Sequence, residues 1–452
     1  MPTVNFNKKY FFEVLERKLS DEELSVKVPM TGVDFKGLSE KTVSYEVFPN
    51  RPDMLSESGF ARALRNFLGI EQKIKEYRAE KSGTFVKINP NVKGVRPFVA
   101  CAIVKGLKLT DEQIKEIINL QEKLHVTFGR NRKKVAIGVY PLEHIGLPIS
   151  YEGREPREIK FVPIGWREEA SAKRILEEHP SGKEFGHLLN GFNKYPVWVD
   201  SLGKIMSLAP IINSEFVGRV TTNTRDIFVE CSGTNFETLQ KAISILVTAL
   251  IDMGGKAEAI ELRYSDGKRV SPRLGFVEHK LDLGYVNKTL GLKLVWKEVK
   301  SCLERMGIKS NKEGVVLVPC YRTDILHMFD LVEDVAIGYG YEKFSDYKFG
   351  EMSVGGISEE VLVEEKVSAL LTGLRFEEVF TFSLVGREDL EDCNFKFGEL
   401  VEIENPKAEG YNYLRPNLLI NLMKTLSINT HNSYPQNLPI YDHNQVFLDL
   451  SL

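Results

Sequence analysis

The sequence predicts an α+β protein that is built from several domains. The chain has 452 residues, a length that suggests roughly three domains. Helical periodicity occurs in separate blocks, and stretches rich in β-branched residues, glycine and proline lie between them. Hydrophobic residues make up 42% and charged residues 27% of the chain. This balance is typical of globular proteins and excludes disordered, collagen-like and coiled-coil chains.

The first third of the chain contains two clear helix signals. Residues 56–68 carry apolar side chains at helical spacing, and Gly69 is a typical helix stop. Glycine and proline residues then indicate a domain boundary near residues 82–95. Thr110 and Gln113 form a capping box, which predicts that a helix begins there.

The middle of the chain reads as strands that surround one long helix. From Val135 to Cys231, short β-branched runs are broken by glycine and proline, with one charged helix near residues 167–178. Thr234 and Glu237 form a second capping box and predict an apolar helix from Phe236 to Met253. Because this helix is apolar nearly all round, we expect it to be buried under a sheet.

The last third begins with a predicted linker at residues 266–273. A helix that ends at Gly307, a strand at residues 314–319 and a second helix around residues 330–338 then form a compact unit. The final unit is predicted to contain, in order, a helix capped by Ser358, strands over residues 377–385 and 399–406, and a helix over residues 418–426.

Charge and cysteine content narrow the class of protein. Lys and Arg number 60 and Asp and Glu number 63, so a net charge of -3 excludes a generally basic coat for nucleic acid and leaves only local basic patches. The five cysteines are scattered without a CxxC pair, which argues against disulfides and structural zinc. The first residues contain no apolar signal core, and the longest apolar run is too short to span a membrane. We therefore expect a cytosolic protein.

The sharpest local signal is a cluster of carboxylates near residue 330. Asp330, Glu333 and Asp334 stand at i, i+3 and i+4 and share one helical face, and Asp324 lies six residues before them. Hard oxygen ligands in this arrangement suit Mg²⁺. The spacing alone favours a simpler interpretation, in which Asp330 and Glu333 form a capping box at a solvated helix end.

A basic strip follows the predicted helix of residues 110–124. Arg130, Arg132, Lys133 and Lys134 fall within five residues, just before an apolar strand. Such side chains can contact phosphates. Taken alone, the strip is more often a charged turn.

The segment of residues 207–234 is strand-like and carries Glu230 on the same face as Phe228, with Ser232 two residues further on. A carboxylate on an apolar face is unfavourable unless it accepts a hydrogen bond, for example from a ligand hydroxyl. An ordinary structural role is the alternative. The eight histidines are dispersed, and the GxGxxG, GxxxxGK[ST] and GxSxG signatures are absent, so residue patterns alone supply no reaction.

Several long motifs, in one order, resemble the beta subunit of phenylalanine–tRNA ligase of the archaeal and eukaryotic type. They are EVFPNRPDMLSESGFARALRNFLG, FGRNRKKVAIGVY, VTTNTRDIFVECSGT, VPCYRTDILHMFDLVEDVAIGYGY and FTFSLVGREDL. The resemblance implies four domains: an N-terminal domain at 1–85, a B3/B4-type editing domain at 86–265, a B5-type helical or winged-helix-like domain at 270–345, and a partial class II synthetase-like antiparallel sheet module at 355–452. It also implies a C-terminally shortened chain.

The resemblance supplies the function that the motifs lack. It implies an α₂β₂ enzyme that joins phenylalanine to tRNA(Phe) with ATP. The alpha subunit would carry the aminoacylation site and bind ATP and phenylalanine. The beta subunit would support that site and hydrolyse misacylated Tyr-tRNA(Phe).

The resemblance also assigns roles to individual residues. It implies an editing pocket with Glu230 as the acceptor for the tyrosine phenol, and with Ser207 and Ser232 lining the pocket or holding the water. It makes the acidic cluster the favoured Mg²⁺ site, with these four ligands: Asp324, Asp330, Glu333 and Asp334. Two alternatives stay open, namely a freestanding deacylase of mischarged tRNA and a non-catalytic tRNA-binding scaffold.

Overall fold

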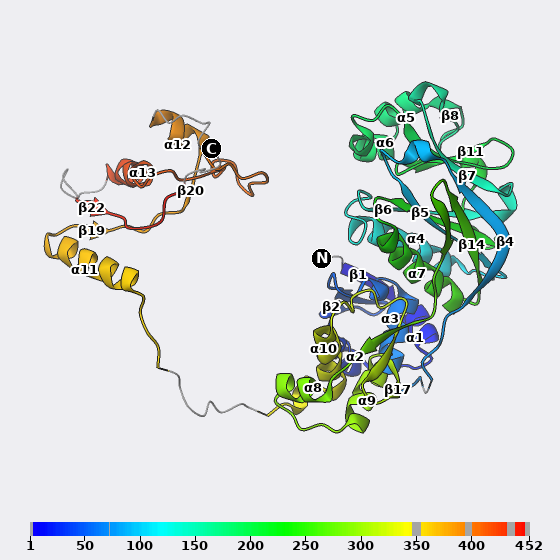
Figure 1. Cartoon of the computed structure of the whole chain (residues 1–452), viewed down its shortest axis with the longest axis horizontal. Coiled ribbons are helices and arrows are strands. Elements are labelled where there is room, and N and C mark those ends of the chain that lie inside the picture. Colours follow the sequence, from blue (N-terminus) through cyan, green and yellow to red (C-terminus); the bar gives the residue numbers. More distant parts are fainter. Residues whose placement is uncertain (1–2, 72, 346–353, 394–399, 432–438, 448–452) are drawn as a thin grey trace. The chain divides into compact units, whose positions relative to one another are not determined.

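The computed structural model describes residues 3–71, 73–345, 354–393, 400–431 and 439–447 (Figure 1). The chain divides into two compact units, Met1–Ser345 and Asp346–Leu452. None of the helices within the described ranges combines the length and the apolar character that crossing a bilayer requires.

The first unit begins with a small antiparallel sheet and three helices. Its elements are β1 (Thr3–Asn7), α1 (Lys8–Leu15), α2 (Asp21–Lys27), β2 (Asp34–Leu38), β3 (Thr42–Glu46) and α3 (Glu57–Phe67). The strand order is β1-β3-β2. The Ser56 side chain accepts a hydrogen bond from the Gly59 N–H and so caps α3, which confirms the helix predicted over residues 56–68.

A ten-stranded sheet forms the centre of the first unit. Its strands are β4 (Ala79–Ile88), β5 (Phe98–Lys105), β6 (Val135–Pro141), β7 (Ile149–Arg154), β10 (Tyr195–Val199), β11 (Ile205–Leu208), β12 (Ile212–Asn213), β13 (Ile227–Gly233), β14 (Lys256–Tyr264) and β15 (Gly267–Ser271). The order is β12-β11-β10-β7-β4-β14-β5-β13-β6, and β15 pairs with β14. Strand β4 pairs in parallel with β14 and β7, and the other pairs are antiparallel.

Two helices, α4 (Asp111–Val126) and α7 (Phe236–Asp252), pack against this sheet, α7 on β5 and β13 and α4 on β6. The burial predicted for the long apolar helix is confirmed, because most of α7 is buried. Its predicted start at Phe236 is confirmed, but the predicted capping residue is wrong. The cap is Asn235, whose side chain accepts from the Thr238 N–H at 2.9 Å, and not Thr234. Asn caps helices as well as Thr does, so the spacing alone could not choose between adjacent residues.

Two further segments of this region complete it. A smaller layer contains β8 (Lys160–Phe161), β9 (Ala170–Ser171), α5 (Ala172–Glu178) and α6 (Pro180–Phe185). The stretch 266–273, predicted as a linker, instead forms strand β15 in a hairpin with β14. A tight turn at Ser265-Asp266 reverses the chain, so the polar residues that suggested a linker lie on an edge strand.

The last part of the first unit combines a three-stranded sheet with three helices. They are β16 (Phe276–Lys280), α8 (Leu283–Leu290), α9 (Trp296–Arg305), β17 (Lys309–Lys312), β18 (Val315–Pro319) and α10 (Met328–Tyr339), with strand order β16-β18-β17. Helix α10 is capped by a box between His327 and Asp330. The capping box predicted between Asp330 and Glu333 is therefore wrong by one turn, because the helix begins at Met328.

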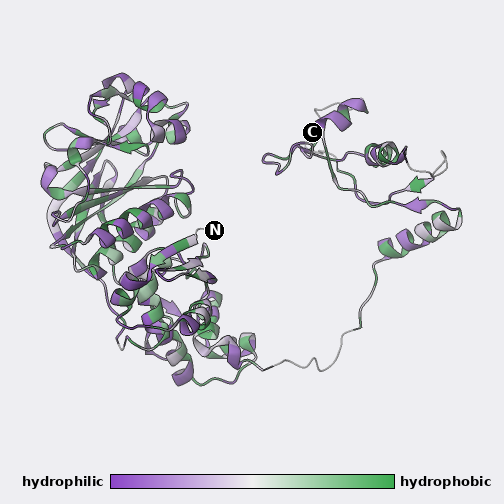
Figure 2. Ribbon diagram, turned by 180° about the vertical axis from the view of Figure 1, so that it is seen from behind, coloured by the Kyte–Doolittle hydropathy of each residue, from purple (hydrophilic) through white to green (hydrophobic). Residues whose placement is uncertain are grey.

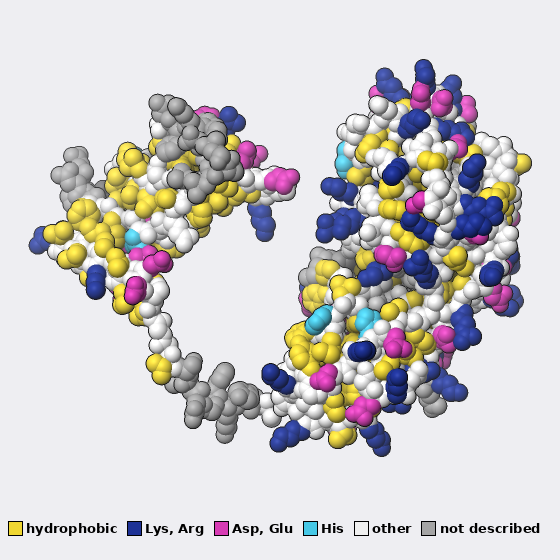
Figure 3. Space-filling view, in the orientation of Figure 1, with side chains coloured by type: hydrophobic (Ala, Val, Ile, Leu, Met, Phe, Trp, Pro, Cys, Tyr) yellow, Lys and Arg dark blue, Asp and Glu magenta, His cyan; other side chains and the backbone are white. Residues whose placement is uncertain are grey.

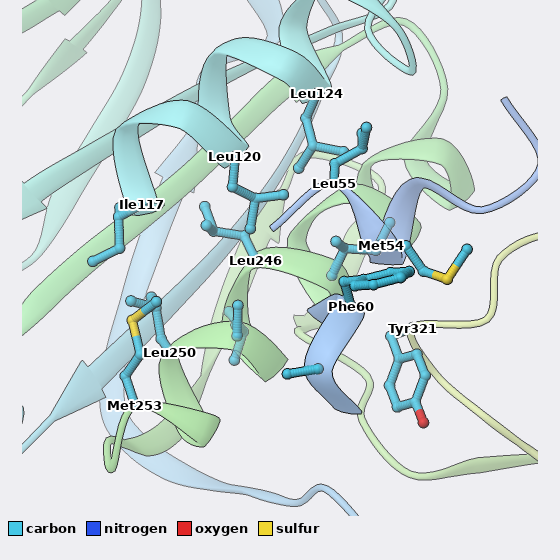
Figure 4. Packing of buried hydrophobic residues seen from close by; sticks show 14 of the residues in the cluster. Met54, Leu55, Phe60, Ile117, Leu120, Leu124, Leu246, Leu250, Met253 and Tyr321 are labelled. Carbon is cyan, nitrogen blue, oxygen red and sulfur yellow. The ribbon is translucent and has the colours of Figure 1, made fainter. Parts of the chain in front are cut away.

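One hydrophobic core joins the beginning of the first unit to its central sheet. Figure 4 shows Leu55 beside Leu124 of α4, and Leu120 beside Leu246 of α7, with Phe60 below them. Because these buried side chains come from distant parts of the sequence, the N-terminal segment and the sheet pack as one body.

The second unit contains α11 (Glu359–Gly373), β19 (Glu377–Glu378), β20 (Leu384–Val385), α12 (Arg387–Asp392), β21 (Tyr413–Leu414), α13 (Leu419–Asn429) and β22 (Ile440–Tyr441). The strand predicted over 377–385 is reduced to two short pairs, β19 with β22 and β20 with β21. Of the strand predicted at 399–406, the described residues show one bridge, at Glu402. Figure 2 shows hydrophobic and hydrophilic segments along α11, which buries no side chain among the described residues.

A buried carboxylate links α4 to the N-terminal helices. Glu116 accepts hydrogen bonds from the Ser58 N–H at 2.8 Å and from the Tyr10 hydroxyl at 2.8 Å. Glu57 lies beside it, and burial followed by the charge of Glu116 raises the pKa of Glu57 to about 7. The folded chain therefore holds a proton on Glu57 that the unfolded chain releases near pH 4.5.

This raised pKa predicts a pH dependence of stability. The contribution of Glu57 is fully present below pH 4.5 and is lost as the pH rises through about 7. Over this window the free energy of unfolding should fall by roughly 1–2 kcal/mol, after allowance for solvent screening. The Glu57→Gln variant should lose this part of the pH dependence in urea titrations, and Glu143→Gln, at an exposed position, should keep it. An unchanged profile in Glu57→Gln would contradict the assignment.

Candidate functional site

The central sheet curls so that its two ends face each other. Strands β11 and β12 end the strand order on one side, and β13 and β6 end it on the other. Even so, the Tyr140 hydroxyl on β6 lies 3.1 Å from Ser207 Oγ on β11 and 3.2 Å from Asn213 Oδ1 on β12. The site lies where these two ends meet.

A cavity of about 220 Å³ lies at this meeting point. Its lining includes a mixture of polar side chains, among them Glu230, Ser207, Asn213, Gln121, His125 and Arg132. Main-chain and apolar side-chain atoms of residues 208–212 form another part of the wall. A polar, mostly preformed cavity of this size suits a small organic group with one or two hydrogen-bonding atoms.

Glu230 is the only acid of β13 and is 4% exposed. The Tyr140 hydroxyl donates to its Oε1 at 3.1 Å. Burial raises the pKa of Glu230 to about 8, although Tyr140, Arg96 and Trp198 act in the opposite direction. Oε2 of Glu230 and Nε1 of Trp198 are both buried and neither has a hydrogen-bond partner among the described residues, although Trp198 acts on the Glu230 carboxyl as a nearby donor and lowers its pKa. A buried acceptor without a partner is unfavourable unless a ligand completes it.

The three residues expected to form the site are not equivalent. Ser207 and Glu230 both line the cavity and meet through Tyr140. Ser232 is fully buried on the same strand, and its Oγ accepts a hydrogen bond from Arg96 Nε at 3.4 Å. Ser232 does not belong to the cavity wall, so its position next to Glu230 in the strand pattern does not bring it to the cavity.

The sequence motifs did not single out Tyr140, Asn213 or His125 as members of the site. Tyr140 could have been found if the pairing of β6 with β13 had been known. In that pairing Gly138 lies opposite Glu230, and Tyr140 lies two residues further along β6, on the same face. His125 Nε2 accepts from the Ile137 N–H at 2.7 Å, and burial lowers its pKa. Nothing in the sequence reveals these partners, since they depend on which strands become neighbours.

The basic strip forms a strained turn at the edge of the cavity. Arg130, Asn131 and Arg132 all have positive φ angles, between 49° and 64°, a conformation that non-glycine residues rarely adopt. Arg96 holds the turn by donating to the carbonyl oxygens of Arg132 and Lys133. Of the four basic residues, Arg132 alone is in the cavity wall, where it donates to the Ile211 carbonyl oxygen at 2.9 Å.

A second, smaller cavity of about 60 Å³ collects the acidic cluster. All four predicted ligands line it: Asp324, Asp330, Glu333 and Asp334. Arg322 Nη2 lies 2.7 Å from Asp324 Oδ2 and 2.6 Å from Asp334 Oδ2. Burial raises the pKa of Asp334 to about 6 in spite of Arg322, whereas Arg322 lowers the pKa of Asp324 against the effect of burial.

The donor chemistry of this cavity suits a hard cation, but its geometry suits one only in part. Asp330 Oδ2 accepts from the N–H groups of Leu326 and His327, each at 2.7 Å, and Glu333 is exposed. Within the described ranges, no three acidic, cysteine or histidine side chains converge as a metal site. Arg322 already forms ion pairs with two of the four carboxylates, Asp324 and Asp334, which leaves Asp330 and Glu333 without an arginine partner.

Two family models match the C-terminal part of the chain. Residues 279–341 match the family described as "tRNA synthetase B5 domain", and residues 345–450 match "Phenylalanyl tRNA synthetase beta chain CLM domain". The phenylalanine–tRNA ligase beta subunit of Thermococcus sibiricus is 40% identical over 392 residues, covering 86% of this chain and 70% of the relative. The Archaeoglobus fulgidus beta subunit is 37% identical over 445 residues, covering 96% and 80%.

A solved structure supports the same relationship. An N-terminal fragment of the phenylalanyl-tRNA synthetase beta subunit from Pyrococcus horikoshii superimposes with a TM-score of 0.72 at 36% identity. The match covers 75% of this chain and 99% of the fragment.

Fold and matches together define a subunit of an aminoacyl-tRNA synthetase, with a mixed α/β multidomain architecture that contains a B5 domain and a CLM domain. The chain belongs to the family of phenylalanine–tRNA ligase beta subunits, in its archaeal form. The resemblance found in the sequence is confirmed.

Proposed function

We propose that the central domain of this beta subunit is a B3/B4-type editing domain that hydrolyses Tyr-tRNA(Phe). The observation that carries the proposal is the buried Glu230, whose Oε2 has no partner among the described residues, in the wall of a 220 Å³ cavity. A pocket built for phenylalanine rejects tyrosine poorly, because a hydrophobic pocket cannot strongly exclude an added hydroxyl. A second site that bonds the hydroxyl selects in the opposite direction, since phenylalanine leaves its buried acceptor unpaired.

The proposed hydrolysis uses the cavity to position a water molecule against the ester. Neither histidine of the wall is a free base. His125 accepts from a backbone N–H through Nε2 and faces Glu122 through Nδ1, and His179 Nδ1 accepts from the Ser181 N–H. Ester cleavage therefore rests on placing water near the terminal ribose, with Ser207 as a cavity hydroxyl, and Ser232 acts behind the wall through Arg96.

Removing the proposed acceptor tests this function. Above the pKa of Glu230, about 8, the Glu230→Ala variant should lower kcat/KM for Tyr-tRNA(Phe) hydrolysis by roughly 10–100-fold, because one hydrogen bond to the ionised, buried carboxylate is worth about 1.5–3 kcal/mol. Glu258→Gln, at a carboxylate of the same sheet that lies outside the cavity, is the matched control. Equal hydrolysis by both variants would contradict the proposal. Hydrolysis by the isolated chain, without any alpha subunit, would favour the freestanding deacylase.

We further propose that the chain acts in the cytoplasm within an α₂β₂ enzyme with tRNA(Phe). The alpha subunit binds ATP and phenylalanine and forms Phe-tRNA(Phe). In support, α11 carries exposed Val363, Val367 and Leu370 at i, i+4 and i+7, and Figure 3 shows hydrophobic side chains gathered over the second unit. An exposed apolar stripe of this kind indicates a protein interface, and a class II-like module that lacks a nucleotide-binding signature is suited to supporting the alpha catalytic site.

A charge placed on this stripe tests the assembly. Leu370→Asp should weaken binding of the alpha subunit by about 2 kcal/mol, or roughly 30-fold in Kd, because it buries an unpaired charge in the contact. The loss should be visible as reduced co-purification. Leu202→Asp, at an exposed leucine of the first unit, should bind normally. Unaltered binding of Leu370→Asp would show that α11 is not the contact. If the wild-type chain binds tRNA but no alpha subunit, the result favours the alternative of a non-catalytic tRNA-binding scaffold.

We also propose a Mg²⁺ site at the 60 Å³ cavity, with Asp330 and Glu333 as its carboxylate ligands and with Asp324 and Asp334 held nearby by Arg322. Mg²⁺ commonly takes one or two carboxylates and keeps several waters, which supports a site with two free acids. When bound, the ion would add positive charge at this cavity, where the N-terminal segment meets α10.

Metal-dependent stability tests the Mg²⁺ site. At a hundredfold excess over its Kd, Mg²⁺ should raise the free energy of unfolding of the full chain by about 2.7 kcal/mol. The Asp330→Asn/Glu333→Gln double variant should lose this increment, and Glu342→Gln, an exposed control, should keep it. The proposal fails if Mg²⁺ stabilises the double variant as much as the wild type, or if it has no effect on either.

A further inference from the structure

The hydroxyl of Tyr140 lies behind the cavity wall and contacts three residues of the lining, Glu230, Ser207 and Asn213, a contact that the proposed editing function does not explain. It lies 3.1 Å from Glu230 Oε1, 3.1 Å from Ser207 Oγ and 3.2 Å from Asn213 Oδ1. A phenol of the protein itself therefore contacts the groups that would recognise the phenol of a bound tyrosine.

The local backbone is built to allow this contact. Gly138 lies opposite Glu230 in the β6–β13 pairing. A Cβ atom at position 138 would lie 2.3 Å from the Tyr140 hydroxyl oxygen and 2.6 Å from Glu230 Oε1. Any other residue at 138 would push the two groups apart, so the glycine leaves the space in which they meet.

Tyr140 is held too firmly to be exchanged for a ligand. Its side chain is fully buried, and its ring stacks on Phe228 with centroids 6.2 Å apart. Phe228 in turn packs edge-on against Trp198. A ligand phenol that displaced Tyr140 would have to break this aromatic layer, which close packing opposes.

Counting hydrogen bonds shows what remains for a ligand. Above the pKa of Glu230, about 8, where the carboxylate is ionised, the cluster contains two hydroxyl protons, those of Tyr140 and Ser207, and more acceptors than these can satisfy. The Tyr140 hydroxyl donates a hydrogen bond to Oε1 of Glu230, whereas Oε2 has no partner in the part of the chain that the structure describes. A tyrosine phenol brings the missing proton, and a phenylalanine ring brings none.

We propose that Tyr140 is a positioning residue that determines specificity: it fixes Glu230 through Oε1 and so leaves Oε2 as the acceptor for the phenol of a tyrosine ester. The inference rests on the proposed editing function and deepens it. Tyr140 acts through Glu230 and does not touch the reacting ester.

The same contact also adjusts the charge of Glu230. The hydrogen bond from Tyr140 favours the carboxylate against the effect of burial, so its removal should raise the pKa of Glu230 further. The other titratable or charged groups around Glu230 are Cys231 on its own strand and three groups on neighbouring segments, Arg96, Cys101 and Tyr151. None of these is changed by a substitution at Tyr140.

The Tyr140→Phe variant of the full chain tests the inference, with Tyr151→Phe as the matched control. Tyr151 is also a fully buried tyrosine of this sheet, and its hydroxyl donates to the Arg96 carbonyl oxygen. Hydrolysis of Tyr-tRNA(Phe) and Phe-tRNA(Phe) is measured between pH 6 and 9, and the thermal midpoint is recorded for each variant. Tyr140→Phe should lower kcat/KM for the tyrosine ester by about 10-fold or more, should change that for the phenylalanine ester by less than about 2-fold, and should move the pH of half-maximal activity upward.

The outcomes separate this inference from the proposed function. If Glu230→Ala loses discrimination while Tyr140→Phe behaves as Tyr151→Phe does, the editing function holds and the role of Tyr140 is overturned. Faster hydrolysis of the tyrosine ester by Tyr140→Phe also overturns it, because the phenol would then be a competitor. If Glu230→Ala has no effect, the editing function itself fails. Gly138→Ala, whose Cβ would displace both the Tyr140 hydroxyl and Glu230 Oε1, should lower hydrolysis of the tyrosine ester at least as much as Tyr140→Phe does.

Discussion

The curl of the ten-stranded sheet is the constraint on which the site depends. Strands at opposite ends of the strand order come close enough for Tyr140 of β6 to reach Ser207 of β11 and Asn213 of β12. A flat sheet would hold these residues far apart, and the cavity would not exist. Helices α4 and α7 pack on the sheet, and the same core continues into the N-terminal segment, so the curl is supported by most of the first unit.

The buried carboxylates of the two cavities differ in whether the protein supplies a partner for them. Asp324 and Asp334 both form ion pairs with Arg322, which is itself almost fully buried. The carboxylate oxygens in such a buried ion pair therefore have a partner within the protein. Glu230 has no arginine at ion-pairing distance and keeps one oxygen without a partner among the described residues. The first arrangement holds the chain together at the B5 domain, and the second leaves an acceptor for something from outside.

Local rules worked where the determining contacts were local. The predicted caps at Thr110 and Ser358 are confirmed, because a side chain and a backbone N–H three residues away decide them. The cap at Thr234 and the box at Asp330–Glu333 failed by one and three residues, since neighbouring Asn235 and His327 fit equally well. The supposed linker at 266–273 became a strand because β14 offered an edge to pair with, which no local pattern reveals.

The sequence by itself determined the family, most helices, the period-two pattern that puts Glu230 on a buried strand, and the grouping of four acids on and before one helix. Only the tertiary structure decided that Ser207 meets Glu230 while Ser232 turns to Arg96, that Tyr140 joins them, and that Arg322 takes two of the four carboxylates. The reason is physical. Burial, hydrogen bonding and charge pairing depend on distances between strands and helices that are far apart in the chain, and periodicity constrains only the faces on which residues lie.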